Sequence, residues 1–164
     1  MAVVTKIIGT VETLNGHFQR EDPLLLTSDE RASPHLVGST VGGRSVRVSL
    51  PRESELHSGD VLALEGEVAI VVRAASEDLL VIEPRDALQW GIAGFQLGNL
   101  HRPVRFTATA MLTPTDGMVA DLLNRLNINY ARRTIPFEGK RYGSFTGHGH
   151  GAGGHHHDHD HHAH

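Results

Sequence analysis

The sequence predicts an α+β protein with a small all-β N-terminal domain, a ferredoxin-like (split βαβ) second domain and a disordered histidine-rich C-terminal tail. Short apolar stretches separated by Gly, Pro and Asp predict strands up to about residue 75. Strand and helix patterns then alternate in the order of a split βαβ fold. The segment after residue 147 holds nine of the 13 histidines and no apolar residue except alanine. We therefore expect domains at residues 1–75 and 76–146, and a tail at 147–164.

The first domain is predicted from alternation and turn signals. Val46, Val48 and Leu50 alternate with polar residues, as in a strand with one buried face. The turn signal Ser58-Gly59-Asp60 precedes two further apolar stretches, residues 61–64 and 68–72, which supply more strands. The polar, small-residue segment 74–78 is expected to break the regular structure, and it marks the boundary between the domains.

The second domain is predicted to begin with a strand at residues 79–82. The helix that follows has Pro84 near its start, and its apolar residues at helical spacing are Leu88, Ile92 and Phe95. Gly98 is expected to end it in a left-handed conformation. Residues 104–111 are expected to be extended. A second helix is predicted to begin at Thr113-Pro114 and to run through Val119, Leu122, Leu123 and Leu126. Residues 129–135 supply a last strand.

The composition excludes several classes of function. Because the chain has no cysteine, it forms no disulfide, thiolate zinc site or iron–sulfur cluster, and any metal must be held by nitrogen and oxygen. Such ligands suit nickel or zinc and disfavour copper(I). A net charge of −4 without a basic stripe argues against a nucleic-acid partner. No apolar run approaches the roughly 18 residues of a membrane span, and the N-terminus lacks the features of a signal peptide. A cytoplasmic location without membrane attachment is therefore expected.

Motifs for enzyme chemistry are missing from the sequence. It contains neither the H-E-x-x-H pattern of zinc proteases nor the G-x-S-x-G pattern of serine hydrolases. It also lacks the phosphate-binding pattern G-x-x-x-x-G-K-[ST], so a partner must bind any nucleotide that is involved. The sequence therefore predicts a protein that is not an enzyme.

The histidines of the tail predict a segment that binds several metal ions, because neutral imidazole is the commonest protein ligand for nickel, copper and zinc. The candidate ligands are His148, His150, His155, His156, His157, His159, His161, His162 and His164. A purification tag is the alternative origin. However, Asp158, Asp160 and Ala163 interrupt the run, and aspartates that lower the charge cost of collecting divalent cations are of no use to a tag.

The four remaining histidines lie outside the tail. His101 follows a predicted helix end and lies between Gly98, which is expected to fix the chain reversal at that end, and Pro103, whose ring restricts the backbone. A lone histidine in such a place commonly has only a surface or capping role. His17, His35 and His57 lie in turn-like surroundings without another histidine at ligand spacing, and we expect them to be solvated.

Three blocks of the sequence resemble the UreE family of nickel-carrying urease accessory proteins, and the resemblance covers essentially the whole chain. The first block is Leu50-Pro51-Arg52 followed by Ser58-Gly59-Asp60-Val61-Leu62. The second is Leu97-Gly98-Asn99-Leu100-His101 with Pro103, and the third is the histidine-rich end. The resemblance implies a first domain similar to a peptide-binding module and a second, ferredoxin-like domain that carries metal and dimerises.

In that family the histidine of the second block lies at the dimer interface, where two copies share one nickel ion, and His101 matches it. A two-fold axis lets one histidine per chain provide two ligands. Leu100 stands where family members usually carry arginine, and residues 107–117 lack the accessory histidines that some members have. Nickel takes four to six ligands, so His148 and His150, the tail histidines closest to the folded domain, or water are expected to supply the rest.

These features together predict a cytoplasmic homodimeric nickel metallochaperone that binds Ni(II) through His101 and the tail and delivers it to the urease apoprotein. The resemblance implies two partners, the GTPase accessory protein UreG and the urease apoprotein with its other accessory proteins, with the β domain as docking surface. A nickel or zinc store acting through the tail is the alternative. A metal-dependent hydrolase is a third hypothesis, and it requires a fixed metal with an open water position.

Overall fold

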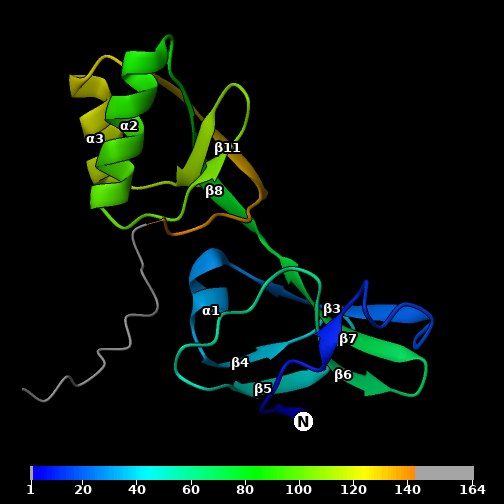
Figure 1. The fold of residues 1–164 in the computed structure, drawn as a ribbon. Helices are drawn as coiled ribbons and strands as arrows, with labels where there is room; N and C mark the ends of the chain where they lie inside the picture. Colours follow the sequence, from blue (N-terminus) through cyan, green and yellow to red (C-terminus); the bar gives the residue numbers. More distant parts are fainter. Residues whose placement is uncertain (1, 143–164) are drawn as a thin grey trace, which may run out of the picture.

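The computed structural model describes residues 2–142, which form two domains joined by a long strand segment (Figure 1). The helices in this part of the chain are α1 (Ser28–Ala32), α2 (Ala87–Asn99) and α3 (Gly117–Arg125). The strands are β1 (Ala2–Val4), β2 (Gly9–Thr10), β3 (Arg20–Leu26), β4 (His35–Ser39), β5 (Ser45–Ser49), β6 (Asp60–Glu65), β7 (Val68–Ala74), β8 (Ser76–Glu83), β9 (Arg105–Phe106), β10 (Met111–Pro114) and β11 (Asn129–Pro136). None of the described helices has the length and apolar character needed to cross a membrane.

The N-terminal domain packs two small sheets against each other. One sheet has the strand order β1-β5-β4 and the other β2-β6-β7-β3. The predicted alternation along β5 is confirmed, because Val46 and Val48 are buried while Arg47 between them and the two flanking serines are exposed. The domain also contains the short helix α1, which the sequence pattern did not indicate. A capping box formed by Thr27 and Glu30 begins this helix.

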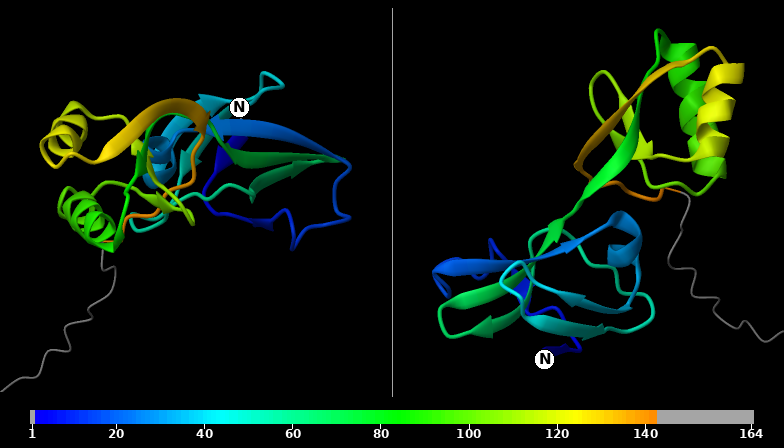
Figure 2. Two further views of the ribbon diagram at one scale, coloured as in Figure 1. Left: turned by 90° about the horizontal axis from the view of Figure 1, so that it is seen from above. Right: turned by 180° about the vertical axis from the view of Figure 1, so that it is seen from behind.

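The C-terminal domain has the ferredoxin-like strand order β11-β8-β10-β9, with α2 and α3 side by side on one face of the sheet (Figures 1 and 2). Leu80 and Ile82 of β8 pack under these helices, whereas Leu79 faces the other way and contacts Phe137. Successive side chains of a strand point to opposite faces of the sheet. The cluster under the helices and the cluster around Phe137 therefore lie on opposite faces of β8. The predicted α+β class is confirmed.

The segment before α3 differs from the sequence-based expectation. Met111–Pro114 is a strand paired with Leu79–Ile82, so the prediction that a helix begins at Thr113-Pro114 is wrong. Pairing with β8 buries Met111 and Leu112, and this burial outweighs the preference of proline for a first helical turn. The helix begins at Gly117 instead, after the N-cap residue Asp116. Residues 104–111, expected to be extended throughout, form a hairpin in which β9 pairs with β10.

The boundary between the domains is also more regular than expected. Ser76 to Asp78, predicted to lie in a break of regular structure, belong to β8, where they pair with residues 134–136 of β11. Only Ala75 separates β7 from β8, and it accepts a backbone hydrogen bond from Phe137 at 3.4 Å. Backbone pairing with β11 therefore overrides the polar, small-residue composition of this segment.

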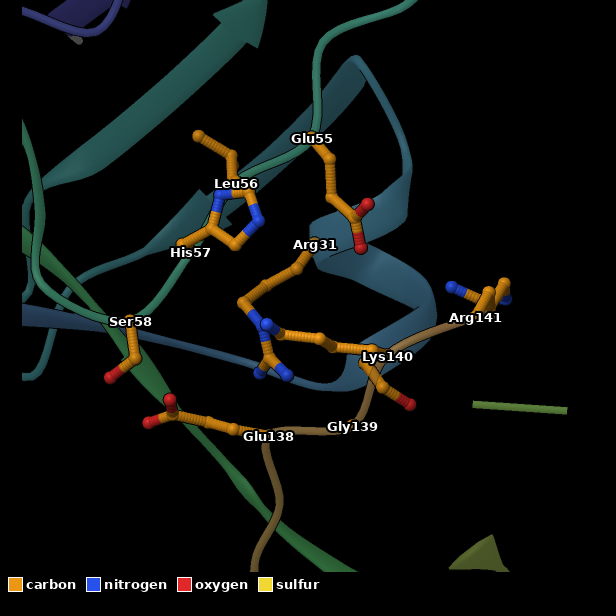
Figure 3. A pocket seen from close by; sticks show the side chains of 10 residues that line it. Arg31, Glu55, Leu56, His57, Ser58, Glu138, Gly139, Lys140 and Arg141 are labelled. Atoms are coloured by element: carbon orange, nitrogen blue, oxygen red, sulfur yellow. The ribbon is translucent and has the colours of Figure 1, made fainter. Parts of the chain in front are cut away.

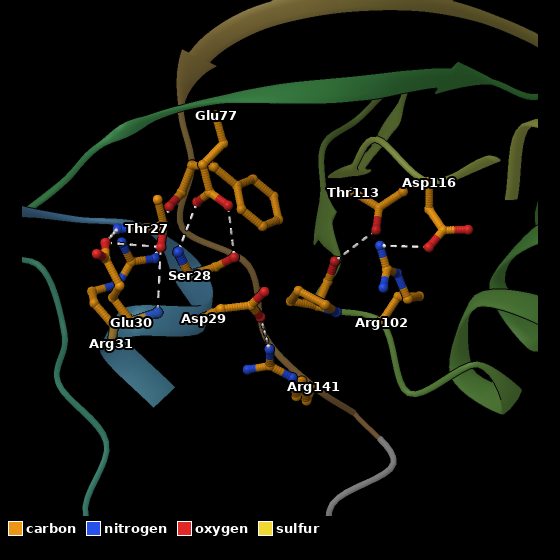
Figure 4. A network of polar contacts seen from close by, with 12 residues as sticks. Thr27, Ser28, Asp29, Glu30, Arg31, Glu77, Arg102, Thr113, Asp116 and Arg141 are labelled. Carbon is orange, nitrogen blue, oxygen red and sulfur yellow. Dashed lines mark hydrogen bonds and ion pairs between the residues drawn. The ribbon is translucent and has the colours of Figure 1, made fainter. Parts of the chain in front are cut away.

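Side chains of both domains meet around α1 and leave a cavity of about 360 Å³ beside it (Figure 3). The backbone N–H and hydroxyl of Ser28 donate to the two carboxylate oxygens of Glu77, each at 2.8 Å (Figure 4). Asp29 pairs with Arg141 at 2.9 Å. These contacts connect the first turn of α1 to the first strand of the C-terminal domain and to the segment that follows its last strand.

Candidate metal centre

His101 occupies the left-handed position that ends helix α2. Its φ is +51°, its N–H donates to the carbonyl of Gly98 at 3.0 Å, and the N–H of Arg102 donates to the carbonyl of Leu97 at 3.2 Å. This pair of bonds is the Schellman motif, whose left-handed residue is usually glycine. The prediction that Gly98 takes this conformation is wrong. The helix continues through Gly98 because Ala93, Leu97 and Leu100, which follow each other at intervals of about one turn, all pack on the core.

Two tethers hold the residues that follow His101 (Figure 4). Arg102 pairs with Asp116 at 3.2 Å, and the other carboxylate oxygen of Asp116 caps α3 by accepting the N–H of Met118 at 2.8 Å. The hydroxyl of the buried Thr113 donates to the carbonyl of Pro103 at 3.0 Å. A non-glycine residue with positive φ is uncommon and persists where its surroundings determine it, often at functional sites. The fold therefore holds the backbone of His101 in place while its side chain stays exposed.

The imidazole of His101 borders a shallow surface hollow. Gly94, Phe95, Gly98, Asn99 and Tyr142 line the rest of this hollow. Tyr142, the last described residue, also packs edge-on against Phe106 with ring centroids 5.3 Å apart. Tyr142 therefore lies close to His101.

Helix α2 presents an exposed apolar surface next to this hollow. Leu88 and Phe95 are 72% and 66% exposed, whereas Ala93 and Leu97 on the opposite side are buried. A second shallow hollow on this surface, here named the α2 face, is lined by Ala87, Leu88, Gly91, Ile92, Phe95 and Gln96. The spacing of Leu88, Ile92 and Phe95 predicted the helix correctly, but these residues lie largely on its outer side. Contiguous exposed apolar surface is typical of an interaction site.

The described residues form no ready-made metal site around His101. Within residues 2–142, no group of three or more His, Asp or Glu side chains is placed to hold a metal ion. His17, His35 and His57 are exposed, as expected, and all three belong to the N-terminal domain. The tail histidines, His148, His150, His155, His156, His157, His159, His161, His162 and His164, lie outside the described residues.

Sequence reasoning missed the residues that surround His101. Arg102 and Asp116 are separated by a strand hairpin, and Tyr142 lies 41 positions beyond His101 in the sequence. Only the predicted helix end at Gly98 and the proline at Pro103 indicated a fixed backbone there. The contacts themselves depend on the fold.

Two family models together match nearly the whole chain. The model described as UreE urease accessory protein, N-terminal domain, matches residues 4–75, and the corresponding C-terminal domain model matches residues 77–164. The chain is 35% identical to the urease accessory protein UreE of Geobacillus kaustophilus over 130 residues, which is 79% of this chain and 88% of that protein. It is 29% identical to the urease accessory protein UreE of Bacillus sp. strain TB-90, again over 130 residues, 79% of this chain and 88% of that protein.

A shorter match covers 55% of this chain and 60% of the urease accessory protein UreE of Staphylococcus aureus, at 43% identity. The models and the relatives agree with the resemblance seen in the sequence. The chain belongs to the UreE family of urease accessory proteins.

Proposed function

We propose that this protein is a nickel metallochaperone that works as a cytoplasmic homodimer. Two His101 side chains, one from each copy, bind one Ni(II) ion, which is then delivered to the urease apoprotein. As a urease accessory protein the chain is not itself an enzyme. The observation that carries the proposal is the exposed imidazole of His101, held in a strained backbone position at the edge of an exposed apolar face.

The α2 face supports the homodimer. In a two-fold arrangement the same patch of each copy meets the other, so residues near the axis face their own counterparts. His101 lies directly beyond the C-terminus of α2, and it shares its hollow with Phe95 of the α2 face. Burying Leu88 and Phe95 between two copies removes their side chains from water, and it places two imidazoles at one edge of the contact.

The dimer is tested by placing a charge on the α2 face. We expect Phe95→Lys to sediment and scatter light as a monomer, because a buried ammonium opposes association. Met118→Lys is the matched control, since Met118 is 64% exposed on α3 and lies outside the α2 face. A Phe95→Lys protein that remains dimeric contradicts this assignment of the interface.

Two imidazoles leave nickel short of its usual four to six ligands, and we propose that the tail or water supplies the others. Tyr142 borders the same hollow as His101. His148 follows Tyr142 by six positions in the sequence, and a chain of that length spans at most about 20 Å. His148 and His150 are therefore within reach of the ion. A shell completed by ligands other than the two fixed imidazoles can be exchanged one ligand at a time, which suits a protein that must release its metal.

The nickel site is tested by calorimetric titration of the chain ending at Gly147, with the mass recorded by light scattering. We expect one tightly bound ion per dimer, lost on His101→Ala and kept on His57→Ala, which removes another exposed histidine from the other domain. Nickel binding that survives His101→Ala refutes the shared site. If only the full-length chain binds nickel, whatever residue stands at 101, the storage hypothesis is favoured.

Storage of nickel or zinc is the second candidate, favoured by the nine histidines after residue 147. Storage requires the tail alone, whereas delivery also requires His101 and a partner. We propose that residues 1–75 dock the partners, the GTPase UreG and the urease apoprotein complex, while residues 76–146 dimerise and residues 147–164 collect metal. Activation of urease apoprotein by the nickel-loaded chain, with UreG and GTP present, separates the two. His101→Ala is expected to abolish activation if the protein delivers nickel and to leave it unchanged if the protein only stores it.

A further inference from the structure

The cavity between the two domains has a buried cation at its floor. Arg31, near the end of α1, is 5% exposed, and its guanidinium donates to the carbonyls of Leu26 at 2.7 Å and Phe137 at 2.8 Å. Phe137 belongs to the C-terminal domain, so Arg31 connects the two domains. No carboxylate lies within 4.0 Å of this guanidinium among residues 2–142. A buried charge is stable when it is paired, and two carbonyls leave the positive charge of Arg31 without a counterion.

A second cation reaches the same cavity. The side chain of Lys140 runs into it toward Arg31 (Figure 3), and within the described part of the chain no acidic group pairs with this ammonium. The position of Lys140 is fixed, since its backbone exchanges two hydrogen bonds with Val104, each at 2.9 Å. Arg141, the third cation of the lining, is paired with Asp29. Two like charges directed into one cavity repel each other unless an anion lies between them.

Acidic side chains also line the cavity, and their positions matter. Glu55 and Glu138 lie at its margin, both exposed, and His57 beside them is exposed as well. Charges in contact with solvent are screened by water and salt, whereas a charge at a buried floor is screened much less. Lys140 is exposed like the two glutamates, so the potential at the floor is dominated by the buried Arg31, and Lys140 adds a donor nearer the solvent.

We infer that this cavity binds an oxyanion, a carboxylate or phosphate group held by Arg31 and Lys140. A guanidinium has five N–H donors, of which only two are used by the carbonyls, so donors remain for the ligand. Arginine and lysine are the usual protein ligands of such groups, and the volume of about 360 Å³ admits one with its substituent. Because Arg31 also holds Phe137, an occupied site stabilises the contact between the domains. This site is independent of the nickel site at His101.

Inorganic phosphate is the first probe, titrated into the metal-free full-length chain at constant ionic strength and followed by ³¹P NMR and by thermal unfolding. We expect saturable binding of one phosphate per chain and a rise in the unfolding temperature that chloride does not produce. Lys140→Gln is expected to weaken binding about two- to fivefold, the effect of removing one exposed charged contact. Lys6→Gln is the matched control, because Lys6 is exposed and lies outside the cavity lining.

An acetyl-capped triglutamate peptide is the second probe, and it separates a carboxylate of a partner protein from a free anion. Binding of phosphate or of the peptide that is weakened by Lys140→Gln and kept by Lys6→Gln supports the site and identifies the source of the oxyanion. Arg31→Met tests the cation at the floor of the cavity. If that variant fails to fold, Arg31→Lys, which keeps the charge, takes its place. Equal effects of the two lysine substitutions, or no saturable binding of either probe, overturn the inference.

Discussion

Replacing His101 by glycine is expected to stabilise the metal-free protein while it removes the imidazole. The backbone of His101 has a φ of +51°, a conformation that costs an L-residue about 1–2 kcal/mol and glycine nothing. Glycine loses more conformational entropy on folding, by about 0.5–1 kcal/mol. The balance is a net gain of about 0.5–1 kcal/mol. For a chain of this size such a gain raises the unfolding temperature by about 1–4 °C.

The assay is thermal unfolding followed by circular dichroism in the presence of a chelator, beside a nickel titration of each variant. His101→Ala removes the same imidazole without relieving the backbone, so it is expected to unfold at a lower temperature than His101→Gly. Asn127→Gly is the matched control, because Asn127 has a φ of +52° in the same motif at the end of α3 and lies far from the candidate site in sequence. If His101→Gly unfolds at or below the temperature of His101→Ala, the strain argument is refuted.

Two further predictions concern close packing and a buried acid. A Cβ at Gly139 would lie 2.3 Å from the ring of the buried Phe137, so Gly139→Ala is expected to lower the free energy of unfolding in urea by about 1–3 kcal/mol. A Cβ at Gly98 meets nothing within 4 Å, so Gly98→Ala is expected to stabilise α2 by about 0.5–1 kcal/mol. Equal effects of the two substitutions would contradict the clash at Gly139. Burial of Asp22 opposes its ionisation, but hydrogen bonds from neighbouring groups and the guanidinium of Arg44 outweigh burial and lower the pKa of Asp22. The stabilisation from this ionised carboxylate is present above its unfolded pKa of about 3.9 and is lost as the pH falls through the lower folded value. Urea midpoints measured from about pH 5 to pH 3 should therefore fall less for Asp22→Asn than for the native chain, and parallel curves would exclude this role.

Helix α2 shows how far sequence patterns reach. The spacing of Leu88, Ile92 and Phe95 indicated a helix, and a helix is present. Periodicity detects an apolar stripe but does not tell whether the stripe faces the core or a partner. In the structure Leu88 and Phe95 are exposed, and the smaller residue Ala93 packs with Leu97 on the sheet. The same packing carries the helix past Gly98, which moves the left-handed position to His101.

Local rules failed where pairing over a long distance in the sequence was stronger. Thr113-Pro114 has the composition of a helix start, yet it lies in a strand because its neighbours Met111 and Leu112 are buried against β8. Segment 74–78 has the composition of a linker, yet most of it pairs with β11. The partner strand lies more than thirty positions from Thr113-Pro114 and more than fifty positions from segment 74–78. Both separations are outside the range of any local pattern.

The sequence by itself determined the α+β class, the order of most strands and helices, a donor set of nitrogen and oxygen, and His101 as the candidate ligand in the folded part of the chain. The first three follow from composition and periodicity, which are properties of neighbouring residues, and the choice of His101 follows from the resemblance of its sequence block to the UreE family. Only the tertiary structure decided the left-handed backbone of His101, the exposure of the α2 face and the meeting of Arg31 with the carbonyl of Phe137, 106 positions away. The physical reason is that burial and hydrogen bonding depend on which distant segments pack together, and a local pattern leaves that choice open.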